Sequence, residues 1–442
     1  MSFRLLPALA ILVTFWVPAA AFAQDQQTPG RSKSGLFIMN EKARIDNISR
    51  ADLFEPLDIS QLDTRTGRQV ERKHKVLPND VTIECYYERE TLGGATEKFK
   101  CVGPEDPNDR NSRLPVIVTD ASGQPMDVKL DKLKVRYGSV KVFSSVITTR
   151  LEWALGFGSD VETPVAKVIC HGCSRDPFKQ KGPVDETTEF PKQGDRPQVS
   201  VEQKLEGTGI YVEGMRFALD RGEDTPAWKW DELDYITDPA RKTQVDALKL
   251  FSAFIKHSDS KALQNKLFCR SDLDSAGICQ DPYLYVHDFG NTLGTTGGAF
   301  GVVGGVLGVL SDLFGIHSTH PLDLKEWQNA KVWKDETKCV ASLQEISRNG
   351  PGLTNPSISE GGRRLLADRL TMLITAKNSD GSSKLRDIFD AAHIEKYDDH
   401  GSHFTADDWV RVFIMRARQI TEKKDPCPEN TPGPSVSSGG QP

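Results

Sequence analysis

The sequence predicts an α+β fold, because strand-like and helix-like segments are concentrated in different parts of the chain. Residues 81–232 hold short runs of alternating apolar and polar residues, separated by turns rich in Gly, Pro and Asn. Residues 233–421 hold longer runs in which apolar residues recur every three or four positions. The chain has 442 residues, 38% hydrophobic and 27% charged, which is typical of a globular protein of one large or two modest domains.

The β-rich part begins with a predicted hairpin over residues 81–102, which turns at a Gly-Gly pair. A further strand is expected at residues 132–138, where basic and apolar side chains alternate. This alternation places Lys132, Lys134 and Arg136 on one face of the strand. The three basic side chains would form either a binding surface or an ordinary solvated strand face.

Helices are expected where apolar residues recur every three or four positions. One follows the basic strand, and four lie in the second half: residues 144–157, 238–255, 358–376, 384–392 and 409–421. Thr405-Ala-Asp-Asp408 has the composition of a capping box at the start of the last helix.

The N-terminus has the features of a secretory signal peptide over residues 1–23. Arg4 supplies the positive charge, an apolar stretch follows, and Ala21-Phe22-Ala23 is an A-x-A cleavage sequence. We therefore expect an exported protein, periplasmic or secreted; the alternative is an uncleaved N-terminal anchor. Residues 24–80 are interpreted as an N-terminal extension, and residues 422–442 as a disordered tail rich in Pro, Ser and Gly.

The eight cysteines are an even number, which favours disulfides in an exported protein. Their positions indicate four local pairs: Cys85 with Cys101, Cys170 with Cys173, Cys269 with Cys279, and Cys339 with Cys427. The spacing alone does not fix this connectivity. The Cys170-His171-Gly172-Cys173 segment has two alternatives, a metal site or a redox-active pair.

A polar motif follows the predicted helix at residues 238–255. It reads His257-x-Asp259-x-Lys261, and Gln264 and Asn265 come directly after it. These residue types in this order look like the catalytic loop of a protein kinase. The usual spacing places the loop amide at Gln264, with Asn265 one residue later.

A second motif, Asp288-Phe289-Gly290, follows the strand-like run at residues 283–286. It looks like the metal-binding DFG of a protein kinase. Either motif alone is a weak signal, but both in this order, with these flanking segments, form a stronger one. The alternative interpretation is an ordinary polar loop followed by a buried strand. The resemblance implies a two-lobed protein-kinase-like fold, with a β-rich N-lobe over residues 81–232 and a helical C-lobe over residues 233–421.

The resemblance also implies roles for individual side chains, because phosphoryl transfer needs mainly positioning and charge neutralisation. Asp259 would accept the proton of an attacking hydroxyl, and Lys261 would contact the transferred phosphoryl. Asp288, with Asn265 or Gln264, would bind Mg²⁺, a hard cation that prefers oxygen ligands. ATP would be the phosphoryl donor.

Residues 135–173 resemble a group of exported bacterial proteins, largely uncharacterised, that have an atypical protein-kinase-like fold. In that group the strand ends in V-K-Y-G, and its Lys holds the ATP phosphates. The following helix begins with a Glu that pairs with the Lys. This chain has Arg136 and Ser145 at those places. Lys134 lies on the face of Arg136 and is the second candidate for binding the phosphates, with Glu152 as a candidate partner.

Three functions are therefore considered. The first is Mg-ATP-dependent phosphoryl transfer to a hydroxyl of an unknown protein, lipid or sugar. The second is a pseudokinase that acts as an extracytoplasmic binding or scaffold module, which Arg136 and Ser145 favour. The third is a structural envelope protein in which the motifs are accidental. A net charge of −6 without a basic block argues against nucleic-acid binding.

Three other segments have alternative interpretations. The uncharged, Gly-rich run at residues 295–316 is expected to be a loop, and membrane contact through it is the alternative. Trp228 and Trp230 are expected to pack in the core rather than stack on a nucleotide base. His393, His400 and His403 are expected in loops and helix caps rather than at a metal.

Overall fold

The computed structural model describes residues 38–39, 41–65, 77–89, 92, 96–128, 130–192, 198–204, 208–212, 227–294, 322–344, 352–399 and 402–429. The predicted signal peptide and the Gly-rich run at residues 295–316 lie outside the described residues.

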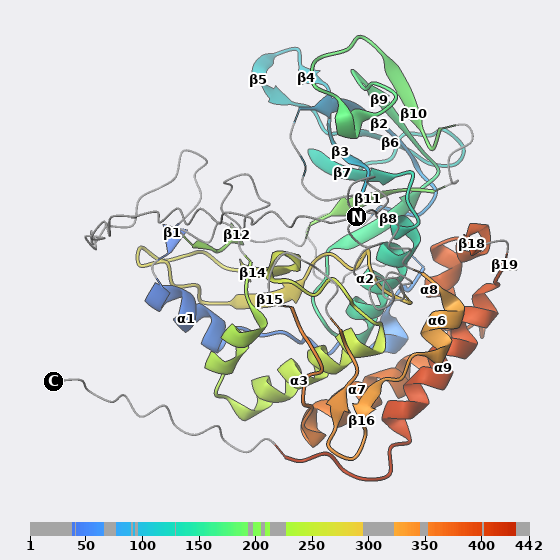
Figure 1. The fold of residues 1–442 in the computed structure, drawn as a ribbon. Helices are drawn as coiled ribbons and strands as arrows, with labels where there is room; N and C mark the ends of the chain where they lie inside the picture. Colours follow the sequence, from blue (N-terminus) through green and yellow to red (C-terminus); the bar gives the residue numbers. More distant parts are fainter. Residues whose placement is uncertain are drawn as a thin grey trace, which may run out of the picture.

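The largest sheet has eight strands and lies at one end of the molecule (Figure 1). Its strands are β2 (Thr82–Glu88), β3 (Lys98–Val102), β6 (Ile117–Thr119), β7 (Lys132–Tyr137), β8 (Val161–Val165), β9 (Lys167–His171), β10 (Thr187–Phe190) and β11 (Val199–Gln203). The order is β10-β9-β2-β3-β7-β11-β8, with β6 paired to β2. Only the β2–β9 pair among these is parallel.

The two faces of this sheet differ in chemistry because side chains alternate along each strand. One face carries apolar residues such as Phe99, Leu133, Val135 and Val201, which pack into a core of their own. The other face carries the charged residues that lie between them in sequence. The predicted alternation along β7 is therefore confirmed.

Helix α2 (Lys141–Leu155) follows β7 and begins three residues before the predicted start. Every residue of α2 after Lys141 is buried, since the helix packs against β8, α7 and α8. It ends at Gly156, whose φ of 97° lies in the left-handed region that favours glycine.

The other helices gather at the opposite end from the large sheet (Figure 1). They are α3 (Pro239–Phe254), α6 (Leu324–Asn329), α7 (Glu360–Thr375), α8 (Lys384–Ala391) and α9 (Ala406–Thr421). Asp238, Ser359 and Thr405 accept backbone N–H bonds at the starts of α3, α7 and α9, and Thr405 forms the expected capping box with Asp408. The predicted helices and the α+β class are confirmed.

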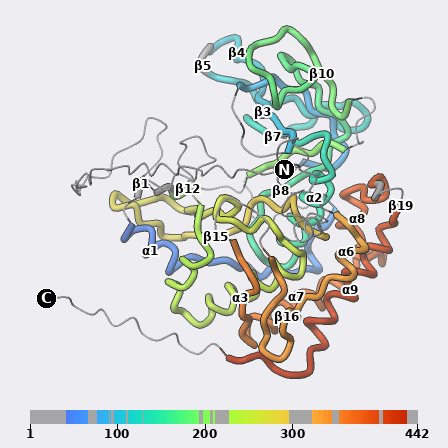
Figure 2. Tube along the Cα trace, viewed as in Figure 1, coloured from blue at the N-terminus to red at the C-terminus, as the bar shows by residue number. Residues whose placement is uncertain are grey.

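A smaller sheet joins β12 (Thr208–Gly209), β14 (Asn265–Cys269) and β15 (Pro282–Val286). Helix α1 (Glu41–Arg50) packs against β15, as the neighbouring blue and yellow tubes of Figure 2 show. Asn47 of α1 donates a hydrogen bond to the Gly277 carbonyl and accepts one from the Cys279 amide, at 3.0 and 2.8 Å. Residues 41–65 of the predicted extension thus contribute to the helical core.

The remaining short strands form four two-stranded sheets. These pairs are β1 (Ile38–Met39) with β13 (Tyr211–Val212), β4 (Glu105–Asp106) with β5 (Asp109–Arg113), β16 (Trp333–Asp335) with β17 (Val340–Ala341), and β18 (Asp398–Asp399) with β19 (Ser402–His403).

All eight cysteines form disulfides in the predicted pairs: Cys85–Cys101, Cys170–Cys173, Cys269–Cys279 and Cys339–Cys427. Cys339–Cys427 fixes the segment after α9 against α7, where the Cys427 amide also donates to Glu360 at 2.9 Å. Four disulfides indicate folding in an oxidising compartment. Within the described ranges, no helix has the length and apolar composition needed to cross a bilayer.

Of the four disulfides, Cys339–Cys427 closes the longest loop, with a sequence separation of 88 residues. Cys170–Cys173 closes the shortest, with a separation of 3. In the chain-entropy treatment, the longer loop stabilises the fold by about 4–5 kcal/mol and the shorter by roughly 2 kcal/mol. We expect the Cys339→Ala/Cys427→Ala pair to lose more stability than the Cys170→Ala/Cys173→Ala pair. Urea unfolding of both variants measures this difference; equal losses would contradict it.

Candidate functional site

The two predicted motifs lie on loops that are bonded to each other along their backbones. The loop after α3 and the loop after β15 share two backbone hydrogen bonds, Ser258 N to Asn291 O at 3.3 Å and Leu293 N to Ile255 O at 2.7 Å. A third backbone hydrogen bond runs from the His287 amide to the carbonyl of Gln264, the residue directly before β14, at 2.7 Å. The structure therefore brings the HxDxK and DFG segments together.

Asp259 is held by the polar side chains of both loops. Lys261 Nζ lies 3.0 Å from Oδ1, and Gln264 Nε2 donates to Oδ2 at 3.0 Å. Asn291 Nδ2 lies 3.5 Å from the same Oδ2. The Asp259 side chain keeps 16% of its surface exposed. Its carboxylate is thus contacted by three polar side chains, while part of the side chain remains exposed.

Asp288 lies at the edge of the same group, with 24% of its side chain exposed. Its Oδ1 accepts a hydrogen bond from the Gly290 amide at 3.1 Å and lies 3.9 Å from Arg136 Nη1. Burial favours the neutral acid, but Arg136, His287 and nearby lysines outweigh it and hold the pKa of Asp288 well below its usual range. Asp288 is therefore a carboxylate at neutral pH.

The charged face of the large sheet supplies the cation beside Asp288. Arg136 is buried and bonds Glu202 at 2.8 Å, while its Nε lies 3.5 Å from Glu162. Lys134 also forms an ion pair with Glu202. The strand register explains this cluster, because Lys134, Glu202 and Glu162 occupy one row across β7, β11 and β8.

The pKa values in this cluster follow from burial and the neighbouring charges. Burial raises the pKa of Glu162. Burial acts in the same direction on Glu202, but Lys134 and Arg136 outweigh it and lower the pKa of Glu202. Burial opposes the charged form of Arg136, yet Asp288, Glu162 and Glu202 raise its pKa. Arg136 is therefore a permanent positive charge fixed beside Asp288.

The acid partner of the basic strand comes from the sheet and not from Glu152, which was a candidate partner. Glu152 is fully buried on α2, and its charged neighbour is Asp160 rather than Lys134 or Arg136. Burial raises the pKa of Glu152 well above its usual value. Glu202 pairs with both basic side chains instead.

The structure also distinguishes the two amides predicted as metal ligands. Gln264 contacts Asp259, as described above. Asn265 is fully buried at the start of β14, and its Nδ2 donates to the Trp228 carbonyl at 2.9 Å. Gln264 is therefore brought to the Asp259 carboxylate, while the Asn265 amide is directed to the core.

His257 is a core residue. It has no exposed surface, and its ring lies 4.8 Å from the Phe289 ring. Burial lowers the pKa of His257 to about 4 despite the nearby carboxylates of Asp259 and Asp288. His257 is thus neutral at pH 7 and fixes the position of the DFG segment through packing.

Trp228 and Trp230 pack in the core, as expected, with ring centroids 4.9 Å apart. Their indole N–H groups donate to the carbonyls of Lys266 and Ser260 at 3.0 and 2.6 Å. These bonds connect the segment before α3 to the loop that carries Asp259.

Helix α2 contacts the DFG loop through hydroxyl groups. Ser144 Oγ donates to the Gly290 carbonyl at 2.9 Å, and the hydroxyls of Thr148 and Thr292 lie 2.9 Å apart. Gly290 itself has little room, since a methyl group there would lie 3.3 Å from Asp288 Oδ1 and 3.3 Å from Lys141 Cδ. The stem of Lys141 therefore lies over Gly290, next to the Asp288 carboxylate.

Sequence reasoning missed several charged or amide groups of this site: Lys98, Lys141, Glu162, Glu202 and Asn291. Glu162 follows Val161 and Glu202 follows Val201, but both strands also hold Ser, Thr or Gln, so the sequence carries only a weak signal for these two acids. Lys98 lies directly opposite Arg136 in the β3–β7 register, and such a register is not readable from one sequence.

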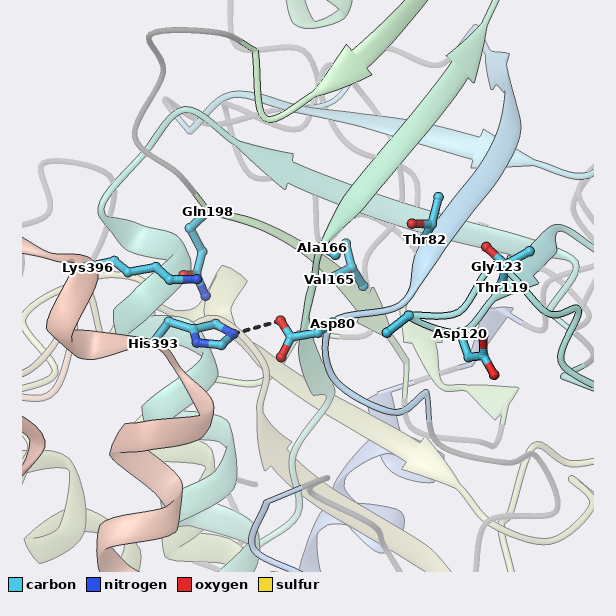
Figure 3. Close-up of a pocket in the computed structure, with 11 residues that line it drawn as sticks. Asp80, Thr82, Thr119, Asp120, Gly123, Val165, Ala166, Gln198, His393 and Lys396 are labelled. Atoms are coloured by element: carbon cyan, nitrogen blue, oxygen red, sulfur yellow. Dashed lines mark hydrogen bonds and ion pairs between the residues drawn. The ribbon is translucent and has the colours of Figure 1, made fainter.

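A separate cavity of about 560 Å³ lies between the large sheet and the turn after α8 (Figure 3). His393 Nε2 lies 2.7 Å from Asp80 Oδ1 in its wall, and Lys396 and Gln198 are close by. None of the residues predicted for phosphoryl transfer lines this cavity. His393 thus contacts the Asp80 carboxylate. His400 lies outside the described residues.

The described residues hold no group of three or more His, Cys, Asp and Glu side chains arranged for a metal ion. Cys170 and Cys173 are joined to each other, and His171 bonds Glu84 at 2.7 Å and Thr187 at 3.0 Å. The metal alternative for this segment is not supported.

The neutral state of buried His257 predicts a pH dependence. Its pKa falls from the usual 6.5 to about 4 on folding, so the unfolded chain binds the extra proton between these values. The contribution of neutral His257 to the free energy of unfolding is complete above pH 6.5. It is lost as the pH falls toward 4, by an amount on the order of 3 kcal/mol. Urea unfolding of wild type and His257→Leu across this range should give a flatter profile for the variant; identical slopes would disprove a buried neutral histidine.

No family model and no curated protein matches this chain. Among solved structures it has similarity to the proinflammatory kinase CtkA of Helicobacter pylori, with 12% identity and a TM-score of 0.32 over 77% of this chain and 95% of that one. It also has similarity to the Shewanella oneidensis HipA–HipB toxin–antitoxin complex with operator DNA, with 10% identity and a TM-score of 0.28 over 84% and 71%. At these scores the similarities carry no argument about this chain.

Proposed function

We propose that the chain binds a nucleoside triphosphate with Mg²⁺ and transfers its terminal phosphoryl to a hydroxyl. The observation that carries this proposal is the convergence of Asp259, Lys261, Asp288 and Arg136. Two carboxylates from different loops lie close enough to Lys141 to act on the pKa of its ammonium group. Phosphoryl transfer requires such a combination of carboxylates for proton and metal binding with cations for the developing charge.

In this mechanism Asp259 accepts the proton of the attacking hydroxyl. The oxygen of that hydroxyl forms a bond to the terminal phosphorus, and the bond from phosphorus to the bridging oxygen breaks to release the diphosphate. Lys261, held 3.0 Å from Asp259, neutralises charge on the transferred group. Arg136, with Lys134 beside it, contacts the phosphates as the fixed cation of the sheet.

The donor set fits Mg²⁺, which prefers carboxylate and carbonyl oxygens. Asp288 is an ionised and partly exposed carboxylate. Gln264 uses its Nε2 to bond Asp259, which leaves its carbonyl oxygen as a donor. Bound Mg²⁺ would neutralise phosphate charge during transfer. We assign Asp288 and Gln264 to this role, in preference to Asn265.

The proposal includes a two-lobed protein-kinase-like arrangement, with the large sheet in the N-lobe and α3 and α6–α9 in the C-lobe. It also includes export, because four disulfides require an oxidising compartment. The acceptor would then be a protein, lipid or sugar hydroxyl outside the cytoplasm.

A binding module without catalysis is the second candidate, and one observation favours it. Arg136 is already paired with Glu202 and Glu162, so much of its charge is compensated before a nucleotide arrives. A pseudokinase of this kind would bind nucleotide and present a surface to a partner. Both candidates would bind the nucleotide, but only the enzyme would transfer its phosphoryl group.

Thermal unfolding of the oxidised protein with and without Mg²⁺ and ATP tests the binding step. A ligand at a hundredfold excess over its Kd stabilises the folded state by about 2.7 kcal/mol. We expect a higher midpoint with both ligands, and loss of the increase in Asp288→Ala. A wild-type protein that shows no increase would exclude both the enzyme and the nucleotide-binding module.

Asp259→Asn separates the enzyme from the binding module. The amide keeps the shape of the side chain but cannot accept the proton, so phosphoryl transfer or ATP hydrolysis should fall by about 10²–10⁴-fold. The ATP-induced midpoint shift should persist in this variant. Wild type that binds ATP and shows no turnover with any acceptor would favour the pseudokinase.

A further inference from the structure

Lys98 and Lys141 are outside the kinase-like motifs, yet Lys98 lies opposite Arg136 and Lys141 lies near Asp288, the two partners of one ion pair. Lys98 begins β3 and is directly opposite Arg136, so it extends over the charged face of the sheet. Lys141 begins α2, and its stem lies over Gly290 next to the Asp288 carboxylate. Two elements far apart in the chain therefore bring lysines to the surroundings of Asp288, near enough for its charge to act on both ammonium groups without an ion pair.

The other cations of the site are already neutralised by acids. Lys134 pairs with Glu202, Lys261 with Asp259, and Arg136 with three carboxylates. Within the described part of the chain, neither Lys98 nor Lys141 forms an ion pair, although both side chains are half-buried. These two are therefore cations of the site whose charge no described acid compensates through an ion pair.

An unpaired ammonium group that is partly withdrawn from water destabilises the folded protein. The cost is visible at Lys98, where burial and then the charges of Lys134 and Arg136 lower the pKa to about 8. Burial also lowers the pKa of Lys141, although Asp288 and Asp259 oppose it. An anion placed between the two lysines would remove this cost in the bound state.

We propose that Lys98 and Lys141 bind a polyphosphate chain directly, without a divalent metal. The inference rests on the proposed function, since it assigns to the nucleotide's phosphate chain two contacts from this sequence alone. A chain of phosphates has charges along its length and can contact both ammonium groups. A single phosphate carries its charge at one point and should therefore gain less from two separate ammonium groups.

Titration calorimetry with sodium tripolyphosphate in excess EDTA tests this site. Wild type should bind tripolyphosphate, and orthophosphate at least about tenfold more weakly. Lys98→Met and Lys141→Met keep the aliphatic stem and should each weaken binding by about 10- to 100-fold, the usual range for a lost charged hydrogen bond. Lys141→Arg should retain binding. Lys167→Met, which removes an exposed lysine paired with Glu189, is the matched control and should bind like wild type.

Thermal unfolding without ligand is the second measurement. If the lysines serve a ligand, both Met variants should unfold at the same or a higher temperature than wild type, because an unpaired buried charge is gone. No binding in EDTA, equal binding by the Met variants, equal binding of orthophosphate, or weaker binding with a lower midpoint would each overturn the proposal. A protein that binds tripolyphosphate but transfers no phosphoryl would refute only the catalytic function.

Discussion

The buried guanidinium of Arg136 is the constraint on which the rest of the site depends. It joins β7 to β11 and β8 through Glu202 and Glu162, and it reaches the loop after β15 through Asp288. Removing one partner from a buried network of this kind typically costs about 3–5 kcal/mol, because the remaining charge loses its compensation. The sheet and the motif loops are therefore coupled by electrostatics as well as by packing. A lysine at this position could not hold three carboxylates in the same planar geometry.

The loops are positioned by a second set of contacts that involves no charge. Backbone hydrogen bonds join residues 255–258 to residues 291–293, and His257 packs on Phe289 between them. The motif histidine thus serves as a neutral part of the core, while Asp259 two residues later reaches solvent. One loop therefore contributes His257 to the core and, two residues later, Asp259 to the site.

Local features of this protein were readable from its sequence, and long-range registers were not. The helical periods, the Thr405 cap and three of the cysteine pairs depend on residues close in sequence and are confirmed. The fourth pair, Cys339–Cys427, spans 88 residues and is confirmed as well. The partner of Arg136 depends on how β7 and β11 align across 66 residues of sequence, so Glu202 was missed and Glu152 was only a candidate partner. The choice between Gln264 and Asn265 depended on where β14 begins. The Gln264 amide, before the strand, bonds Asp259, whereas the Asn265 amide, at the first residue of the strand, bonds the Trp228 carbonyl.

Helix α2 is buried along its length and is bonded to the DFG loop through Ser144 and Thr148. A helix in that position can act as a switch only if it can move away and be resolvated. Here such a movement would expose an apolar surface and the buried acid Glu152, and it would break contacts to α7 and α8. A swing of α2 away from its neighbours would therefore carry a large free-energy cost, so this helix is a fixed support for the DFG loop rather than a movable element.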